Sequence, residues 1–258
     1  MNAGSSDAAS PFDDGDLYDV LVAGFSYGIE PYVALARAAA GPVLEIACGT
    51  GRVTLPCLQA GADVDGLDLS PAMLSTLRVK AAALGFSPTL YQADMSDFRL
   101  PRRYALILIT FNAFIHNLTQ EAQIRCLQRC REHLEPGGML AFDTYFPSLA
   151  IIGAPQHSRV LEGETKHPRT GEVIRLYDTR SFDRVEQIQH SLNEVEAVDA
   201  AGNVRTLQRS EFRVRWVYKA EMALLLRAAG FARWEIHGAF ERRPLTEETD
   251  DMIVHAWT

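Results

Sequence analysis

Two glycines and a later aspartate have the spacing of a nucleotide-binding site. Residues 43–54 read Val-Leu-Glu-Ile-Ala-Cys-Gly-Thr-Gly-Arg-Val-Thr, so a short apolar run leads into Gly49 and Gly51 before a helical pattern begins. Glycines let the backbone approach a ligand where a Cβ would collide. A second apolar run ends at Asp68, 17 residues after Gly51. A carboxylate at a strand end can accept hydrogen bonds from ribose hydroxyls, so the spacing predicts an adenosine-containing cofactor.

The glycine loop departs from the dinucleotide fingerprint at two positions. Thr54 stands where a third glycine is expected, and Glu45 lies in the preceding strand, four residues before Gly49. A carboxylate there would repel a pyrophosphate and attract an ammonium group. The loop therefore favours a cofactor with an amino-acid end, and an NAD(P)-dependent oxidoreductase is the weaker alternative.

Four segments in order over residues 45–140 resemble the class I S-adenosylmethionine-dependent methyltransferases. They are Glu45 to Gly51, Gly66-Leu-Asp-Leu-Ser-Pro-Ala-Met-Leu74, Gln92-Ala-Asp-Met95 and His133-Leu-Glu-Pro-Gly-Gly-Met-Leu140. The resemblance implies S-adenosyl-L-methionine as cofactor and S-adenosyl-L-homocysteine as product.

The resemblance also assigns roles around the glycine loop. The backbone at Ala47, Gly49 and Gly51 would hold the methionine end of the cofactor. Glu45 would order the loop itself, or would reach the ammonium group through water. Asp68 would accept from both ribose hydroxyls, with a helix-capping or turn aspartate as the alternative.

The adenine would lie against residues of the next two segments. Leu69 and Met73 can line an apolar slot, although Met73 at this spacing is almost as well explained as helix core. Asp94, followed by Met95, matches the family position whose carboxylate accepts from the adenine amino group. A loop-capping aspartate is the alternative for Asp94.

Two residues, His116 and Tyr18, are candidates for the transfer step, and Phe111 is a candidate for binding the methionine end of the cofactor. Phe111 follows the fourth strand, where its ring could face a sulfonium by cation–π attraction. His116 has an ordinary pKa that suits proton removal near neutrality, or it packs at a helix start. Tyr18, in a Leu-Tyr-Asp sequence that resembles small-molecule N-methyltransferases, would lie near the transferring methyl or would anchor an N-terminal helix.

Hydrophobic periodicity predicts the elements that position these residues. Helical and strand patterns alternate with short connections up to residue 144, which is typical of a parallel sheet with right-handed crossovers. Ligands then bind beyond the carboxyl ends of the strands. We expect helices over 30–39, 51–60, 119–134 and 219–229, one more from Ser70-Pro71, and strands over 42–47, 63–68, 88–92, 104–109, 138–144, 232–239 and 251–257.

Period-two alternation takes over after Pro147, over 158–166, 172–183, 186–199 and 203–217, with turn signals between. The predicted fold is α/β, a doubly wound, mostly parallel seven-stranded Rossmann-like sheet with an inserted antiparallel β lid.

We expect residues 17–150 and 217–258 to form the cofactor-binding domain, 151–216 the lid, and 1–16 to lack fixed structure. The lid would cover the mouth of the site and place Tyr145, Arg215 and Trp216 within reach of the acceptor.

Composition limits the partners. The chain has 258 residues with a formal net charge of −8, and residues 151–216 carry equal numbers of basic and acidic side chains, which argues against nucleic acid. No apolar run is long enough to cross a membrane. Four cysteines in a chain of this size suggest a reducing, cytoplasmic setting, and the protein is expected to be a monomer or homodimer. No metal site is predicted, because Cys126 and Cys130 have only His133 at ligand spacing.

We therefore expect a methyltransferase that acts on nitrogen or oxygen of a small-molecule acceptor by in-line displacement. The Asn/Asp-Pro-Pro-Tyr sequence of base and amide methylators is missing after the fourth strand. A non-catalytic sensor or assembly subunit with the same fold is the alternative, because it would keep the same cofactor residues.

Overall fold

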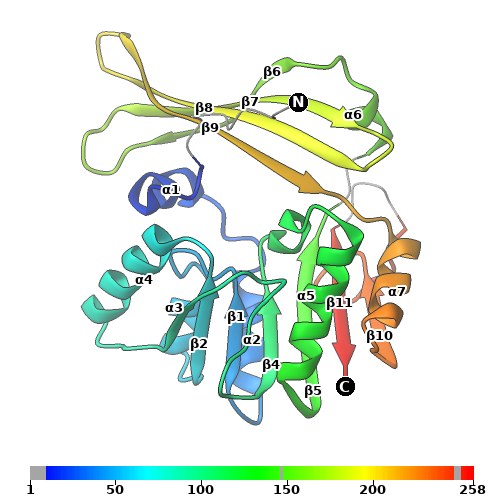
Figure 1. Ribbon diagram of the computed structural model, residues 1–258. Coiled ribbons are helices and arrows are strands. Elements are labelled where there is room, and N and C mark those ends of the chain that lie inside the picture. The colour runs from blue at the N-terminus through cyan, green and yellow to red at the C-terminus, as the bar shows by residue number, and fades with distance from the viewer. Residues whose placement is uncertain (1–9, 146–147, 247–250) are drawn as a thin grey trace, which may run out of the picture.

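The strands of the described residues form two separate sheets. The computed structural model describes residues 10–145, 148–246 and 251–258 (Figure 1). A seven-stranded sheet has the order β10-β11-β5-β4-β1-β2-β3, and a four-stranded sheet has the order β6-β7-β8-β9. The strands are β1 (Val43–Ile46), β2 (Val64–Asp68), β3 (Leu90–Gln92), β4 (Tyr104–Ile109), β5 (Leu134–Thr144), β6 (Ser158–Lys166), β7 (Val173–Asp183), β8 (Ile188–Val198), β9 (Val204–Arg215), β10 (Arg233–His237) and β11 (Met252–Trp257).

The helices are α1 (Gly15–Val22), α2 (Ile29–Ala38), α3 (Thr54–Gln59), α4 (Pro71–Ala83), η1 (Ala113–His116), α5 (Gln120–His133), α6 (Leu149–Gly153) and α7 (Lys219–Ala228). Side chains of α5 and α7 pack in one apolar cluster with the large sheet, and side chains of α2 and α3 pack in a second cluster with β1, β2 and β4. The large sheet is therefore covered on both faces, as a doubly wound fold requires.

Parallel pairing brings the functional loops together. β1 pairs in parallel with both β2 and β4, and β4 pairs in parallel with β5. All four residues of β1 are buried, which explains why this strand reads as a continuous apolar run around Glu45. β11 runs antiparallel between β5 and β10. These pairings confirm the predicted fold class.

Local sequence signals account for several helix starts. The Ser70 hydroxyl accepts from the Met73 N–H at 3.2 Å, and Pro71 occupies the first helical position of α4. Among residues 1–16, positions 1–9 lie outside the described part of the chain. The expectation of no fixed structure is wrong for residues 10–16, because Asp14 caps α1 and the Phe12 carbonyl accepts from the Ser70 hydroxyl at 2.7 Å.

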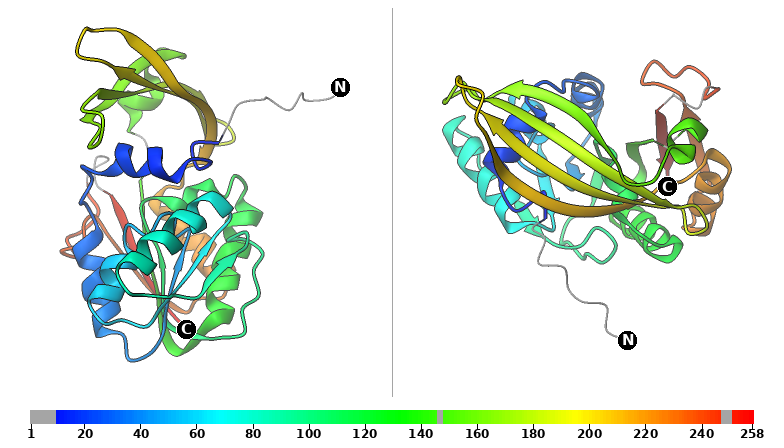
Figure 2. Two further views of the ribbon diagram at one scale, coloured as in Figure 1. Left: turned by 90° about the vertical axis from the view of Figure 1, so that its left-hand side faces the viewer. Right: turned by 90° about the horizontal axis from the view of Figure 1, so that it is seen from above.

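The four-stranded sheet lies across the carboxyl ends of the parallel strands, with α1 between the two sheets (Figures 1 and 2). Each of its strands pairs antiparallel with the next. One apolar cluster joins the sheet to α1, and it contains Ile174, Val195 and Ala197 with Leu17, Val20 and Leu21. The N-terminal helix is thus the layer on which the second sheet rests.

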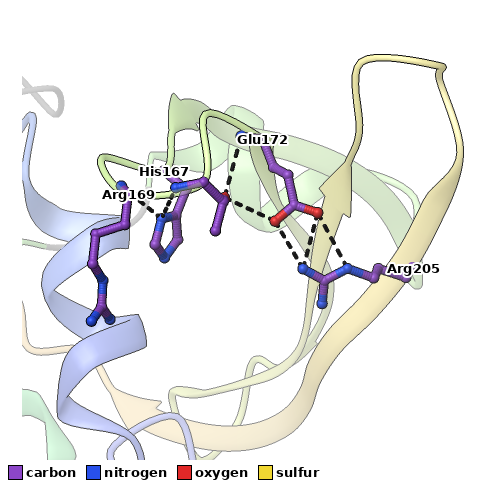
Figure 3. A network of polar contacts seen from close by, with 5 residues as sticks. His167, Arg169, Glu172 and Arg205 are labelled. Carbon is purple, nitrogen blue, oxygen red and sulfur yellow. Dashed lines mark hydrogen bonds and ion pairs between the residues drawn. The ribbon is translucent and has the colours of Figure 1, made fainter.

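Polar contacts fix the turn between β6 and β7 (Figure 3). Nδ1 of His167 accepts from the backbone N–H groups of Arg169 and Thr170, each at 3.2 Å. The Glu172 carboxylate accepts from the Thr170 hydroxyl and forms an ion pair with Arg205 at 2.9 Å. These side chains lie at the surface, so they define the turn and add little to the free energy of folding.

The thiols of Cys126 and Cys130 and the imidazole of His133, which the sequence analysis considered as metal ligands, make contacts within the protein. Cys126 and Cys130 are fully buried in the apolar layer between α5 and the sheet. Both ring nitrogens of His133 contact backbone, the Leu100 N–H at 2.9 Å and the Arg129 carbonyl at 2.7 Å. In the described residues, no helix is long and apolar enough to cross a membrane.

Candidate active site

The candidate site forms where β1, β2, β4 and β5 end. Asp68 is the last residue of β2, and its carboxylate accepts from the Gly49 N–H and the Ser70 N–H, each at 2.8 Å. Burial raises the pKa of Asp68, and the N–H bonds act against that shift. The carboxylate therefore links the glycine loop to the start of α4, and each oxygen keeps a further lone pair for a ligand.

The Glu45 side chain holds the glycine loop in place through hydrogen bonds to two threonine hydroxyls. Its carboxylate accepts from the Thr54 hydroxyl and, at 2.8 Å, from the Thr110 hydroxyl. The side chain is 2% exposed, and burial raises its pKa to about 7. Threonine replaces the third glycine because its hydroxyl is needed by this buried carboxylate. The contacts agree with the loop-ordering alternative for Glu45.

The two glycines have different surroundings. Gly51 lies at φ +90°, and a Cβ there would come 2.3 Å from Cδ1 of Leu77. Gly49 lies at φ +54°, and a Cβ there would meet nothing within 4 Å. Gly51 is thus required for packing of the loop on α4, and the open space for a ligand lies at Gly49.

Asp143 is a site residue that the sequence analysis missed. Its Oδ1 accepts from the Tyr32 hydroxyl at 2.6 Å and the Phe111 N–H at 2.9 Å, and its Oδ2 accepts from the Asn112 N–H at 2.8 Å. Burial raises the pKa of this carboxyl. Both donors of the β4 loop have positive φ, 56° at Phe111 and 60° at Asn112, and the buried Oδ1 of Asn112 has no partner among the described residues. An acidic residue near the end of a predicted central strand was the available signal.

The N-terminal helix is tied to the glycine loop by Asp19, a second residue that was missed. One Asp19 oxygen accepts from the Thr50 hydroxyl, and the other pairs with Lys80 at 2.6 Å. Tyr18 on the same helix has its pKa raised to about 12, mainly by burial, while Arg52 lowers it and Asp68 raises it. The phenol is therefore close to the loop and stays protonated, so it can donate a hydrogen bond.

His116 lies in an aromatic setting at the end of η1. Its ring centroid is 5.4 Å from that of Phe12 and 6.0 Å from that of Phe212 on β9. Burial lowers its pKa to about 4. The imidazole is therefore neutral at pH 7 and is a weaker base than its ordinary pKa suggested.

Phe111 and Arg52 form a cation–π pair at the mouth. The guanidinium carbon of Arg52 lies 4.1 Å from the Phe111 ring centroid, and Nη1 donates to the carbonyl oxygens of Phe25 and Tyr27. A cation thus already occupies one face of the ring that was expected to face a sulfonium.

The residues expected around an adenine are divided between the surface and the interior. Leu69 is 65% exposed, and Asp94 is exposed and accepts from the Ser96 N–H at 2.7 Å. Met73 is 1% exposed, and the Met95 sulfur accepts from Nδ2 of Asn117 at 3.0 Å. Leu69 and Asp94 can therefore meet a ligand, whereas Met73 lies in the packed interior.

The three residues expected to meet the acceptor are also divided. Arg215 is 6% exposed, donates to Oε1 of Gln123 at 2.8 Å and pairs with Glu221 at 2.7 Å. Trp216 is 2% exposed beside Phe182. Arg215 thus fastens the end of β9 to α5 and α7, whereas the Trp216 ring packs on β7. Tyr145 instead reaches the second sheet, where its hydroxyl donates to Oε1 of Gln189 at 3.2 Å.

Comparison with known proteins identifies the class to which this site belongs. Residues 43–138 match the model of a methyltransferase domain. The dTDP-3-amino-3,4,6-trideoxy-alpha-D-glucopyranose N,N-dimethyltransferase of Streptomyces venezuelae is 32% identical over 149 residues, which are 55% of this chain and 61% of that protein. The cypemycin N-terminal methyltransferase of a Streptomyces species is 25% identical over 212 residues, 82% of this chain and 81% of that protein.

Solved structures extend the likeness over the whole chain. The CcbJ methyltransferase from Streptomyces caelestis has a TM-score of 0.71 at 26% identity and covers 96% of this chain and 97% of its own. The sugar N-methyltransferase KedS8 from Streptoalloteichus has a TM-score of 0.73 at 20% identity, with 99% and 98% covered, and shares the fold. Residues 43–138 therefore form a methyltransferase domain, and the chain as a whole has the fold of the methyltransferases named here.

The cofactor of this family fits the residues present. Gly49 leaves open space for a ligand. The Asp68 carboxylate at the end of β2 and the unpartnered Oδ1 of Asn112 offer hydrogen-bond acceptors for a ribose and an ammonium group. Tyr18 is close enough to Asp68 and Arg52 for their charges to act on its pKa.

Asp68→Ala removes the carboxylate that accepts from the Gly49 N–H and whose remaining lone pairs could accept from ribose hydroxyls. We expect the affinity for S-adenosyl-L-homocysteine to fall by about 1.5–3 kcal/mol, the usual contribution of hydrogen bonds to a charged group. Isothermal titration calorimetry measures the change, and Asp97→Ala, an exposed carboxylate in a neighbouring loop, is the control. Unchanged affinity would remove Asp68 from the cofactor site.

Gly51→Ala and Gly49→Ala separate packing from ligand access. Both alanines would have a left-handed backbone, which costs about 1–2 kcal/mol. Gly51→Ala also overlaps Leu77, so we expect a further loss of about 1–3 kcal/mol in the free energy of unfolding without cofactor. Urea denaturation compares the two variants, and equal stability would contradict the packing role of Gly51.

Proposed function

We propose that this chain transfers a methyl group from S-adenosyl-L-methionine to an amine nitrogen of a small polar acceptor, which binds under the four-stranded sheet. The proposal treats residues 151–216 as a lid on the cofactor-binding domain formed by 17–150 and 217–258. The supporting observation is a cluster of buried polar side chains on the face of the lid that is turned toward the cofactor-binding domain.

Strand register puts this cluster on the face toward the site. Asp178 pairs with Asn193 and then Ser210 across β7, β8 and β9, and the next row contains Ser191 and Phe212. Alternate residues share a face of a strand. Phe212 lies beside His116, so the side chains on this face of the sheet point toward the candidate active site.

The cluster is buried and incompletely paired. Asp178 Oδ2 accepts from Arg180 and, at 3.1 Å, from the Ser191 hydroxyl, which also accepts from Nε2 of Gln189. Asp178 Oδ1 and the Ser210 hydroxyl are buried without a partner among the described residues. An unpaired buried polar group costs about 1–3 kcal/mol. A ligand with N–H and O–H donors would meet both needs.

The low basicity of His116 favours an amine over a hydroxyl group as the methyl acceptor. The cofactor, when bound, supplies an electrophilic methyl group. A neutral amine can attack it without prior deprotonation, whereas a hydroxyl needs a strong base, and His116 with its pKa of about 4 is a weak one. Two relatives, one named for an amino sugar and one for an N-terminus as acceptor, also point to nitrogen.

The residues of the chain then act by binding and orientation. Asp178 and Ser210 would hold polar groups of the acceptor, Tyr145 would close the lid side through Gln189, and Tyr18 would donate a hydrogen bond near the methyl group. Fixed geometry of this kind contributes about 7–11 kcal/mol to lowering a bimolecular barrier. His116 would form one wall and accept a hydrogen bond from the amine.

His116→Ala tests whether the imidazole is an obligatory base. We expect kcat to fall less than about tenfold, because an amine acceptor needs no base with a pKa near 7. Any limb of the rate–pH profile that depends on His116 should lie near pH 4, since the neutral form persists above its pKa of about 4. A loss above about 10²-fold together with a limb near pH 6.5 would make His116 the general base.

A panel of amino sugars, matched hydroxyl sugars and amino-terminal peptides tests the function directly. Production of S-adenosyl-L-homocysteine is measured, and we expect turnover with amines and none with their hydroxyl counterparts. Asp178→Asn should raise KM for the amine about tenfold or more, the effect of losing a hydrogen bond to a charged group, with cofactor affinity unchanged.

Asp183→Asn, an exposed change on the same strand, is the control for this measurement. Tight cofactor binding without turnover on any acceptor would favour the non-catalytic sensor. Turnover confined to hydroxyl acceptors would overturn the assignment to nitrogen.

A further inference from the structure

A group of three ligating side chains lies at the far edge of the seven-stranded sheet. Glu235 and His237 belong to β10, and His255 belongs to β11. Each offers one ligand atom, and these three atoms lie within 4.8 Å of one another. None of them belongs to the candidate active site described above.

Antiparallel pairing explains why the three meet. Glu235 is directly opposite His255, and His237 is opposite Ile253. Because alternate residues of a strand share a face, Glu235, His237 and His255 project from the same side of the β10–β11 ladder. The intervening Trp234 and Ile236 project to the other face, where they pack against the core.

These side chains use little of their hydrogen-bonding capacity. His255 is 4% exposed, and its buried Nδ1 has no hydrogen-bond partner among the described residues. Glu235 contacts His237 at 3.3 Å, Arg233 at 3.4 Å and Arg242 at 3.8 Å, and the last distance is too long for a hydrogen bond. Three long contacts leave the carboxylate available to a stronger partner.

We propose that Glu235, His237 and His255 bind a divalent transition-metal ion, with zinc as the fitting example. Two imidazole nitrogens and one carboxylate oxygen are ligands that zinc accepts in proteins, at metal–ligand distances of about 2.0–2.2 Å, and water would complete the tetrahedron. Coordination at Nδ1 of His255 would supply the partner that this atom lacks. The ligand atoms must approach one another slightly, and surface contacts of Glu235 are weak enough to allow it.

Two positively charged side chains lie beside the proposed site. The Arg242 and Arg233 guanidinium groups compete for Glu235, but both side chains are more than half exposed and can turn toward solvent.

A bound ion would clamp β10, the edge strand, to β11. The turn after β10 carries Phe240, whose ring packs on Tyr32 at 5.2 Å between centroids, and the Tyr32 hydroxyl donates to Asp143. The clamp would therefore stabilise the segment that supports one wall of the candidate active site.

Zinc binding to the tag-free, chelator-treated full chain tests the site. We expect one saturable ion per chain by calorimetry, a higher thermal midpoint with zinc, and visible cobalt absorption typical of tetrahedral coordination. Glu235→Gln and His237→Gln, which replace partly exposed side chains, should each weaken binding at least about tenfold while the apo proteins keep their thermal midpoints.

Two controls make the result specific. His190→Gln, at an exposed histidine of β8, should bind zinc like the parent protein. The four cysteines are free and buried, so they offer no competing surface site. No saturable binding, or equal binding by Glu235→Gln, His237→Gln and the parent protein, would overturn the proposal. Cofactor affinity is measured separately, so failure here leaves the methyltransferase assignment intact.

Discussion

Two buried carboxylates hold the candidate active site in shape. Glu45 at the end of β1 and Asp143 near the end of β5 accept hydrogen bonds from groups that would otherwise be unpaired at the ends of parallel strands. Parallel pairing forces these ends to meet, and the loops that follow turn sharply with several positive φ angles. A buried acceptor is the economical way to satisfy the N–H groups that such turns direct inward. The glycine loop and the β4 loop depend on these two side chains for their positions.

Burial raises the pKa values of these same two carboxyl groups. Burial disfavours the charged form of both Glu45 and Asp143, while the hydrogen bonds and the Arg52 cation act in the opposite direction. Arg52 thus has an electrostatic role beside the two acids, and its guanidinium also covers Phe111. A cationic cofactor end placed nearby would add to this balance and favour ionised carboxylates.

The face of the four-stranded sheet that is turned toward the large sheet has an apolar part and a polar part. Its apolar part, around Ile174 and Val195, rests on α1, which is fastened to the glycine loop through Asp19 and Thr50. Its polar part contains Asp178 and Ser210, each of which has a buried oxygen without a hydrogen-bond partner among the described residues. One helix, α1, therefore contacts both the four-stranded sheet and the glycine loop.

The sequence alone determined what depends on short-range patterns. Gly49, Asp68 and the Ser70-Pro71 helix start were predictable, because strand ends, turns and caps are encoded by residues a few positions apart. The alternation of helices and strands predicted the sheet for the same reason. Only the tertiary structure decided that Gly51 faces Leu77, that Asp143 receives the β4 loop, and that burial makes His116 a weak base. Glu235, His237 and His255 likewise come together through strand register. These features depend on contacts between residues distant in sequence, and on the desolvation those contacts cause, which no spacing pattern contains.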